Sequence, residues 1–183
     1  MVGLVFYGVG IGVMVRSELG LNPWQVFHEG ASIQTGLTMG TITIITGAGV
    51  LLLWIPLRER IGAGTVLNVL TIGPTLDLTL WLVPDTETLW VRIVYIVGGT
   101  VLVGLATGMY VGAGLGPGPR DGLMTGLARR GLSIRVARTL IEITVLALGW
   151  LLGGTVGLGT VFFALAIGPL SQFFLARWTV TAP

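Results

Sequence analysis

Apolar residues run through this chain in long blocks that are separated by short polar or glycine-rich segments. Six blocks are long enough, or nearly so, to cross a bilayer, since a membrane-spanning helix needs about 20 apolar residues. They cover residues 2–15, 39–57, 64–83, 93–111, 134–152 and 159–176, and the first is the shortest. The pattern therefore predicts six transmembrane helices.

Two of the separating segments share a pattern of glycine and proline. GLNPWQVFHEG occupies residues 20–30, and GPGPRDGLMTG occupies residues 116–126. In each, a proline follows a residue that suits a helix N-cap, which predicts short helices over 23–35 and 119–130. Such a helix either lies flat on the membrane surface or enters the membrane as a re-entrant half-helix. The density of glycine and proline favours the re-entrant placement, but both stay open.

A second pair of segments extends this similarity into an internal repeat. IGAGTVLNVLTIGP at 61–74 matches VGLGTVFFALAIGP at 156–169 with an offset of 95 residues. Residues 1–83 thus form one repeat and residues 89–178 another, within a single membrane domain over 1–183. The alignment also predicts that the first span begins before Met1, and no basic region precedes the apolar residues to indicate a cleaved signal peptide.

Each repeat contains three spans, and an odd number means that the second copy enters the membrane from the opposite side. The expected fold class is an all-α integral membrane protein. Its six transmembrane helices form two inverted three-helix repeats, each with a short re-entrant or interfacial helix.

Composition narrows the class of protein further. Hydrophobic residues make up 53% of the 183-residue chain and charged residues only 10%, whereas soluble domains carry about 25% charged residues. The ten basic residues are all arginines in short loops or near span ends, so the net charge of +2 indicates membrane orientation rather than nucleic-acid binding. The lipid bilayer is the expected environment, and a homodimer is left open.

Arginine also predicts the orientation of the spans. The loops on the side of the N-terminus carry most of the arginines, which are Arg58, Arg60, Arg120, Arg129, Arg130 and Arg135. The opposite side carries Arg16 and Arg92 among several acidic residues. By the positive-inside rule, both termini are expected in the cytoplasm of a bacterium, with the protein in its inner membrane.

The paired glycine–proline segments, together with a GTV…IGP motif in each half, resemble the YczE/YyaS/YitT-type bacterial membrane proteins. The resemblance covers nearly the whole chain, and GLGPGPRDGLMTGL is its most specific motif. The first copy in this family often reads G-L-G-P-W-D, whereas this chain has Asn22 and Gln25 in place of the glycine and aspartate. The resemblance implies a multi-pass inner-membrane protein, presumed to be a transporter, with a vitamin-like substrate such as a B6 vitamer.

Glycine–proline pairs fall near the middle of the third and sixth spans, at Gly73, Pro74, Gly168 and Pro169. Proline removes a backbone hydrogen bond, so each pair predicts a helix break, and matched breaks in two halves indicate a midplane binding site. A kink that only shapes packing is the alternative. Asp77 follows the first pair, and Gln172 holds the matching position in the second repeat. A carboxylate within a span is costly and usually functional, so Asp77 is expected to bind a cation or carry a proton, unless it forms a structural ion pair.

Other polar residues complete the candidate site. Arg138 and Glu142 share one face of the fifth span, where they either neutralise each other or take part in transport. Asn68 lies on the third span, where an amide also serves contacts between helices. If the short helices are re-entrant, the residues at their N-termini meet substrate; these are Asn22, Trp24, Gln25, Arg120 and Asp121.

Two G-x-x-x-G spacings and the only histidine have simpler interpretations. Residues 8–12 and 104–108 hold matching glycine pairs, which are expected to let the first and fourth spans pack closely, at a seam either between the two halves or between two copies of the chain. His28 has no second histidine or cysteine to share a metal, so no metal site and no cofactor are expected. His28 is expected to be solvated.

The favoured function is a small-solute membrane transporter or facilitator with a midplane site between the repeats. The alternative is a non-transporting assembly or sensor protein that binds a partner through cytoplasmic arginines. An enzyme is not expected, because the chain has neither a metalloprotease motif nor a nucleophile with its histidine partner.

Overall fold

A computed structural model describes residues 1–114 and 116–178, so Leu115 and the end of the predicted domain at 179–183 lie outside the described residues. The described part contains eight helices and no β-strand. The helices are α1 (Val2–Ser17), α2 (Pro23–Thr35), α3 (Met39–Leu57), α4 (Ala63–Leu82), α5 (Leu89–Gly112), α6 (Pro119–Ala128), α7 (Ile134–Leu151) and α8 (Leu158–Trp178).

Every apolar block predicted to span a membrane is a helix, with bounds within a few residues of the prediction. Four of these helices, α3, α4, α5 and α8, are long and apolar enough to cross a bilayer. At most 33% of the residues in each of their apolar windows are buried within the chain, so most of the apolar surface faces outward. Helix α1 is apolar but shorter, and α7 carries Arg135, Arg138 and Glu142.

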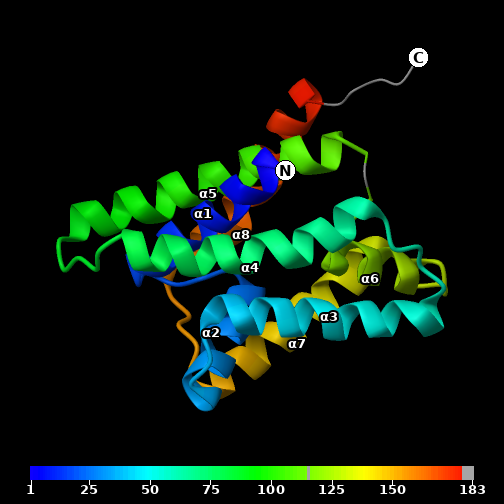
Figure 1. Cartoon of the computed structure of the whole chain (residues 1–183), viewed down its shortest axis with the longest axis horizontal. Coiled ribbons are helices and arrows are strands. Elements are labelled where there is room, and N and C mark those ends of the chain that lie inside the picture. Colours follow the sequence, from blue (N-terminus) through cyan, green and yellow to red (C-terminus); the bar gives the residue numbers. More distant parts are fainter. Residues whose placement is uncertain (115, 179–183) are drawn as a thin grey trace.

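The helices form two groups that meet at α4 (Figure 1). On one side, α1 packs against α5 and α4, and α5 packs against α8. On the other, α2 packs against α7, α6 against α3, and α3 against α4. Each short helix thus packs on a long helix from the opposite half of the chain. Helices α7 and α8 have no packing comparable to that of α3 and α4.

Glycines let α1 approach its neighbours closely, but not in the arrangement that the G-x-x-x-G spacings predicted. A Cβ on Gly12 would lie 2.6 Å from Cβ of Thr79 on α4, and one on Gly108 would lie 2.8 Å from Cβ of Phe174 on α8. Those glycine pairs therefore face α4 and α8. The α1–α5 contact that they were expected to form instead passes through Gly10 and Gly99, which lie opposite each other.

The glycine–proline pairs do not break their helices, so the predicted helix breaks are wrong. Pro74 lies inside the continuous helix α4, and Pro169 lies inside α8. A proline removes one backbone hydrogen bond, and the turns on either side carry the helix past it. Gly73 instead permits close packing, because a Cβ there would lie 2.6 Å from the backbone oxygen of Gly40 on α3. Gly168 has open space at the same place.

The two linkers that lead into the short helices make matching contacts. Gly20, before α2, has φ of 118°, and a Cβ there would lie 2.6 Å from the backbone nitrogen of Gly157. Gly116, before α6, also has φ of 118°, and a Cβ there would lie 3.2 Å from Cα of Gly62. Only glycine suits a positive φ together with such a close approach. Each linker is thereby fixed to the start of the last long helix in the other half of the chain.

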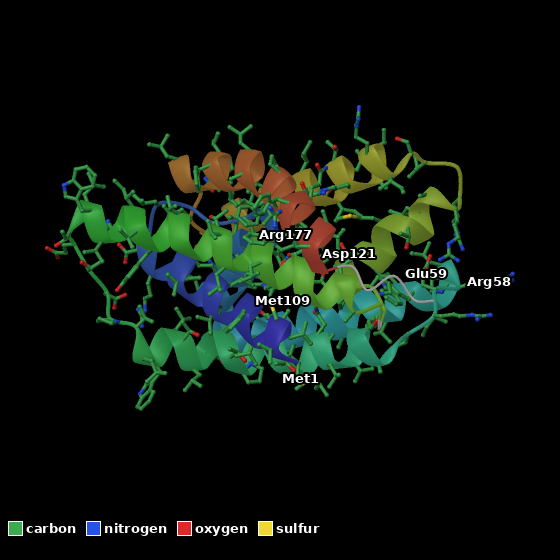
Figure 2. All side chains as sticks on the ribbon, turned by 90° about the horizontal axis from the view of Figure 1, so that it is seen from above. Met1, Arg58, Glu59, Met109, Asp121 and Arg177 are labelled. Atoms are coloured by element: carbon green, nitrogen blue, oxygen red, sulfur yellow. The ribbon has the colours of Figure 1, made fainter. Side chains whose placement is uncertain are left out.

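Ion pairs gather at opposite ends of the bundle. Arg16 pairs with Asp85, and Arg92 pairs with Glu18 at 2.6 Å, where α1 and α4 end and α5 begins. At the other end Arg129, after α6, pairs with Glu59. In Figure 2 Arg58 and Glu59 mark this second end, where α3 turns back toward α4.

Candidate functional site

The N-terminus of α2 is built as the sequence predicted. Asn22 is the N-cap, and its side-chain oxygen accepts a hydrogen bond from the backbone N–H of Gln25 at 3.1 Å. Pro23 takes the first helical position, where no N–H is needed. Asn22, Trp24 and Gln25 are all buried, so this helix end lies inside the protein rather than on its surface.

The N-terminus of α6 differs in one respect that matters for binding. Its N-cap is Gly118, which has no side chain to accept a hydrogen bond from the first turn. Pro119, Arg120 and Asp121 follow. The first N–H groups of this helix are therefore left uncapped, at an end that carries a partial positive charge.

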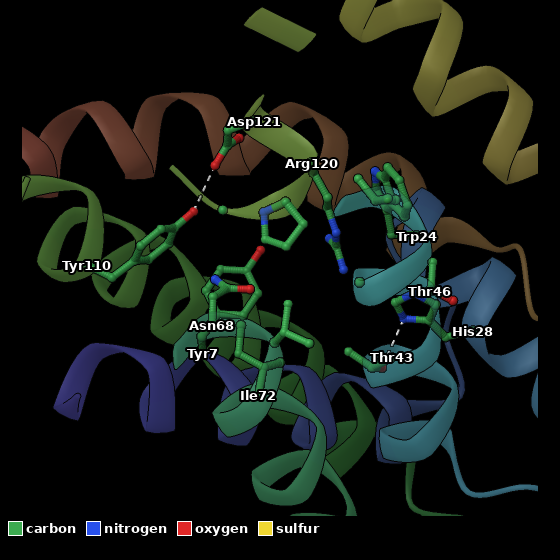
Figure 3. Close-up of a pocket in the computed structure, with 15 residues that line it drawn as sticks. Tyr7, Trp24, His28, Thr43, Thr46, Asn68, Ile72, Tyr110, Arg120 and Asp121 are labelled. Carbon is green, nitrogen blue, oxygen red and sulfur yellow. Dashed lines mark hydrogen bonds between the residues drawn. The ribbon is translucent and has the colours of Figure 1, made fainter. Parts of the chain in front are cut away.

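Both helix ends border one cavity, with about 570 Å³ of space that no protein atom occupies, part of it open to the surroundings. Figure 3 shows Arg120 extending into it beside Trp24 and His28, with Asp121 and Tyr110 on the other side. Tyr7, Asn68 and Ile72 lie between the two groups in this view. The cavity thus draws its lining from α1, α2, α3, α4, α5 and α6, with Thr43 and Thr46 supplied by α3.

A second, larger cavity of about 910 Å³ shares part of that lining. Tyr7, Trp24, Tyr110, Arg120 and Asp121 border both spaces, which we call together the central hollow. The larger space extends between α7 and α8, and its further lining includes Asn22, Arg138, Glu142, Gly168 and Gln172. The central hollow therefore lies along the gap left where α7 and α8 do not pack on each other.

Several polar groups around the central hollow have no hydrogen-bond partner among the described residues. They include Nε1 of Trp24 and Nε2 of His28, although these side chains are only 6% and 1% exposed. The Arg120 guanidinium lies 4.9 Å from the Trp24 ring centroid, and no described carboxylate pairs with it. A buried polar group without a partner is costly, so each one indicates a place for a polar ligand or water.

Three charged groups of the hollow, Asp121, Arg138 and Glu142, do have partners. The Tyr110 hydroxyl donates a hydrogen bond to Asp121 at 3.0 Å. On α7, Nε of Arg138 donates to Glu142 at 2.9 Å, the mutual neutralisation that their spacing allowed. Arg120 is consequently the cation of the hollow whose charge is least compensated.

Asp77 lies away from the hollow and lines neither of the two cavities. Its carboxylate accepts hydrogen bonds from the Thr38 hydroxyl at 2.6 Å and from the backbone N–H of Gly40 at 2.7 Å. Thr38 is the N-cap of α3, so Asp77 fixes α4 to the start of α3. Gln172, which matches Asp77 in sequence, lines the larger cavity instead. The structure does not bring these two residues together as walls of one site.

Of the remaining candidate residues, Asn68 contacts the hollow and Gln25 does not. Asn68 lines the smaller cavity. Gln25 lies behind the lining, where its side-chain oxygen is 3.2 Å from Nδ1 of His28. The described residues contain no group of three metal-ligating side chains.

Sequence reasoning missed three residues of the hollow. Tyr7 and Tyr110 lie inside apolar blocks, and only a polar hydroxyl within a span would have singled them out. His28 was expected to be solvated, but it is buried on α2, where its Nδ1 lies 3.1 Å from the Thr43 hydroxyl.

The fold and the hollow define a class: a helical membrane protein of several spans with a polar cavity in its interior. The chain belongs to DUF6198, a protein family of unknown function whose model matches residues 1–176. It is similar to the Bacillus subtilis uncharacterized membrane protein YczE, with 35% identity over 180 residues, 96% of this chain and 83% of that protein. These matches bear out the family resemblance drawn from the glycine–proline motifs.

Two further relatives are similar over most of their length. An uncharacterized protein of Haemophilus influenzae is 44% identical over 173 residues, which cover 94% of this chain and 79% of that protein. The uncharacterized Bacillus subtilis protein YyaS is 29% identical over 182 residues, 95% of this chain and 89% of that protein. No solved structure matches the chain. The relatives are bacterial, which is consistent with a bacterial membrane.

Proposed function

We propose that the protein is a small-solute transporter or facilitator whose binding site is the central hollow. The observation that carries this proposal is the pair of buried polar atoms without partners at the hollow, Nε1 of Trp24 and Nε2 of His28, beside the half-buried Arg120 guanidinium. A non-transporting bundle would have no use for these costly groups in its interior. The two short helices are then re-entrant half-helices that present their N-termini to the solute.

The proposal includes six spans arranged as two inverted repeats. Matching contacts support it, because each recurs between equivalent residues at an offset of 95 or 96 residues, and two of the three recur with the halves exchanged. Between the halves, Gly20 approaches Gly157 as Gly116 approaches Gly62, and Gly30 approaches Leu152 as Gly126 approaches Leu57. Within each half, Gly12 approaches Thr79 as Gly108 approaches Phe174. A two-fold rotation that exchanges the halves accounts for this reciprocity.

The halves differ at one place, and this difference suggests how a solute crosses. Helix α3 is closed on α4 through Gly40 and Gly73, whereas α7 is apart from α8 and Gly168 faces open space. In inverted-repeat transporters, the opposite access state is reached when the two halves exchange conformations. We propose that α7 closes on α8 while α3 leaves α4, so that the hollow opens in turn to each side.

The mechanism can be tested by locking the closed half, because the chain contains no cysteine of its own. Cysteines introduced by Thr38→Cys and Asp77→Cys replace the hydrogen-bonded pair that joins α3 to α4. Proteoliposomes that contain this variant are incubated with a bacterial metabolite extract, and the retained solutes are identified by mass spectrometry. We expect a retained solute that disappears when the pair is cross-linked and returns when the cross-link is reduced.

The matched control carries Thr86→Cys alone, which offers the same reagents a thiol in the loop before α5. Uptake by this control should not respond to cross-linking or reduction. If no solute is retained beyond that in empty liposomes, or if uptake persists in the cross-linked protein, the transport mechanism is wrong. Absence of any uptake would leave the assembly or sensor role as the alternative.

Orientation and location follow from the arginine distribution. We propose that both termini face the cytoplasm of a bacterium and that the protein lies in the inner membrane. Arg58, Arg129 and Arg130 then belong to the cytoplasmic end of the bundle. The vitamin-like substrate that the family resemblance implied stays a prediction.

A further inference from the structure

The smaller cavity of the central hollow has two chemically opposite ends. Figure 3 places Arg120 beside Trp24 and His28 at one end, and Asp121 beside Tyr110 at the other. Arg120 and Asp121 are consecutive residues of the first turn of α6, so their side chains leave the helix in different directions. They form no ion pair with each other. One helix end thus presents a positive and a negative group to the same enclosed space.

The end with Arg120 suits an anionic group. No described residue accepts a hydrogen bond from the guanidinium, and the adjacent first turn of α6 is left uncapped by Gly118. A second, independent feature lies on α2: the indole N–H of Trp24 is buried, has no partner and borders the same cavity. A guanidinium, an uncapped helix N-terminus and a free N–H all donate hydrogen bonds, which is what a carboxylate or phosphate requires.

The end with Asp121 suits a protonated or quaternary amine. Among the residues that the structure describes, the Tyr110 hydroxyl is the one side-chain donor to the Asp121 carboxylate. The rings of Tyr7 and Tyr110 meet edge to face with their centroids 6.0 Å apart, so aromatic surface surrounds this end. Gly118 keeps the approach open, because a Cβ there would come within 3.3 Å of the Asp121 carboxylate. A carboxylate next to aromatic faces attracts ammonium groups through its charge and through cation–π contacts.

Net charge decides between a simple ion and a zwitterion. The charges of Arg120 and Asp121 cancel, and Arg138 and Glu142 at the edge of the hollow neutralise each other. A simple anion or cation would add one unbalanced charge within the membrane interior, where it is poorly solvated. A zwitterion pairs each end and leaves the site neutral.

We propose that the central hollow binds a small zwitterion, with its carboxylate or phosphate at Arg120 and Trp24 and its amine at Asp121, Tyr7 and Tyr110. This inference rests on the proposed function, since it names the class of solute that the transporter carries.

Matched probes test this on the purified full-length protein in detergent, with dissociation constants measured by calorimetry. The zwitterions are glycine betaine and L-phenylalanine. Their separated halves are acetate and tetramethylammonium for the first, and 3-phenylpropionate and phenethylamine for the second. We expect at least one zwitterion to bind roughly tenfold or more tightly than either of its halves, the effect of one added charge-assisted contact.

Two variants assign the ends. Arg120→Gln should abolish the advantage of the zwitterion over its amine half while amine binding is kept. Asp121→Asn should abolish the advantage over the acid half while acid binding is kept. The retained binding in each case shows that the variant is folded. Arg92→Gln is the control, because Arg92 pairs with Glu18 at the end of the bundle and lines neither cavity, and the ratios should not change.

Equal affinities for zwitterions and their halves, or no binding of any probe, would overturn the assignment. Loss of both advantages in a single variant would also overturn it, since the two ends would not be separate. Because binding is measured in detergent, it is independent of transport. Zwitterion-selective binding without solute uptake in proteoliposomes would support this inference and contradict the proposed function. Uptake without a zwitterion preference would support the proposed function and contradict this inference.

Discussion

Asp77 holds α4 to the N-terminus of α3, and Asp77→Ala removes both hydrogen bonds that do so. One bond comes from the backbone N–H of Gly40 at 2.7 Å and the other from the Thr38 hydroxyl at 2.6 Å. A carboxylate at this position also interacts favourably with the positive end of the α3 dipole. The substitution should therefore destabilise the closed packing of α3 on α4.

The magnitude follows from the surroundings of the two bonds. The bond to Gly40 is partly buried and has a charged acceptor, which is worth about 1.5–3 kcal/mol. The bond to Thr38 is exposed to the surroundings of the bundle and contributes less, about 0.5–1 kcal/mol. We expect Asp77→Ala to lower the free energy of unfolding by about 2–4 kcal/mol. Asp77→Asn keeps one acceptor and should cost about half as much.

The assay is reversible unfolding in detergent micelles, followed by far-ultraviolet circular dichroism. Thr38→Val is measured alone and together with Asp77→Ala, and the two losses should be less than additive because the residues share a hydrogen bond. Unchanged stability of Asp77→Ala would refute the reasoning, and so would strict additivity. Since Asp77 lines neither cavity, ligand affinity in the central hollow should stay as in the wild type.

Three further outcomes are expected. A cysteine introduced by Thr86→Cys should react with an impermeant thiol reagent from outside intact cells, because the proposed orientation places the loop before α5 outside the cytoplasm. Reaction only after lysis would reverse the proposed orientation. Gly122→Ala should lower the free energy of unfolding by about 1–3 kcal/mol, because the new Cβ would meet the Trp54 ring. Adding Trp54→Phe should recover part of that loss. Equal stability of the wild type and Gly122→Ala would contradict this packing. Arg92→Gln should lower the free energy of unfolding by less than about 1 kcal/mol in the same assay, because its partner Glu18 is largely exposed. A larger loss would mean that the ion pair is better shielded from solvent than its exposure indicates.

The helices could be predicted from the sequence because local chemistry decides where they begin and end. Runs of apolar residues set the long helices, and Asn22 with Pro23 set the start of α2. The similarity between the glycine–proline segments also paired Gly20 with Gly116, and both have φ of 118°. These signals lie within a few residues of each other or recur at a fixed offset, so no knowledge of the packing was needed.

The arrangement of the site could not be predicted, because it depends on contacts between distant segments. The Asp77 carboxylate bonds residues nearly 40 positions earlier in the chain, and its spacing gave no sign of them. The G-x-x-x-G pairs correctly predicted close helix packing but not the partner helix, because a glycine indicates only that another segment lies close to it. Tyr7 and Tyr110 reach the hollow from the two halves of the chain, α1 and α5.

The exchange of short helices between the halves has a consequence for how the protein is synthesised. Helix α2 is made early, yet the helix that covers it, α7, follows about a hundred residues later. Until α7 is synthesised, Trp24 and His28 lack part of the enclosure that buries them, and the start of α8 is still missing beside Gly20. A nascent chain stalled after α4 would therefore hold α2 without α7, the helix that packs on it. Such a chain would be a natural substrate for membrane chaperones or proteases. Co-translational folding can end only when the last helix has been inserted.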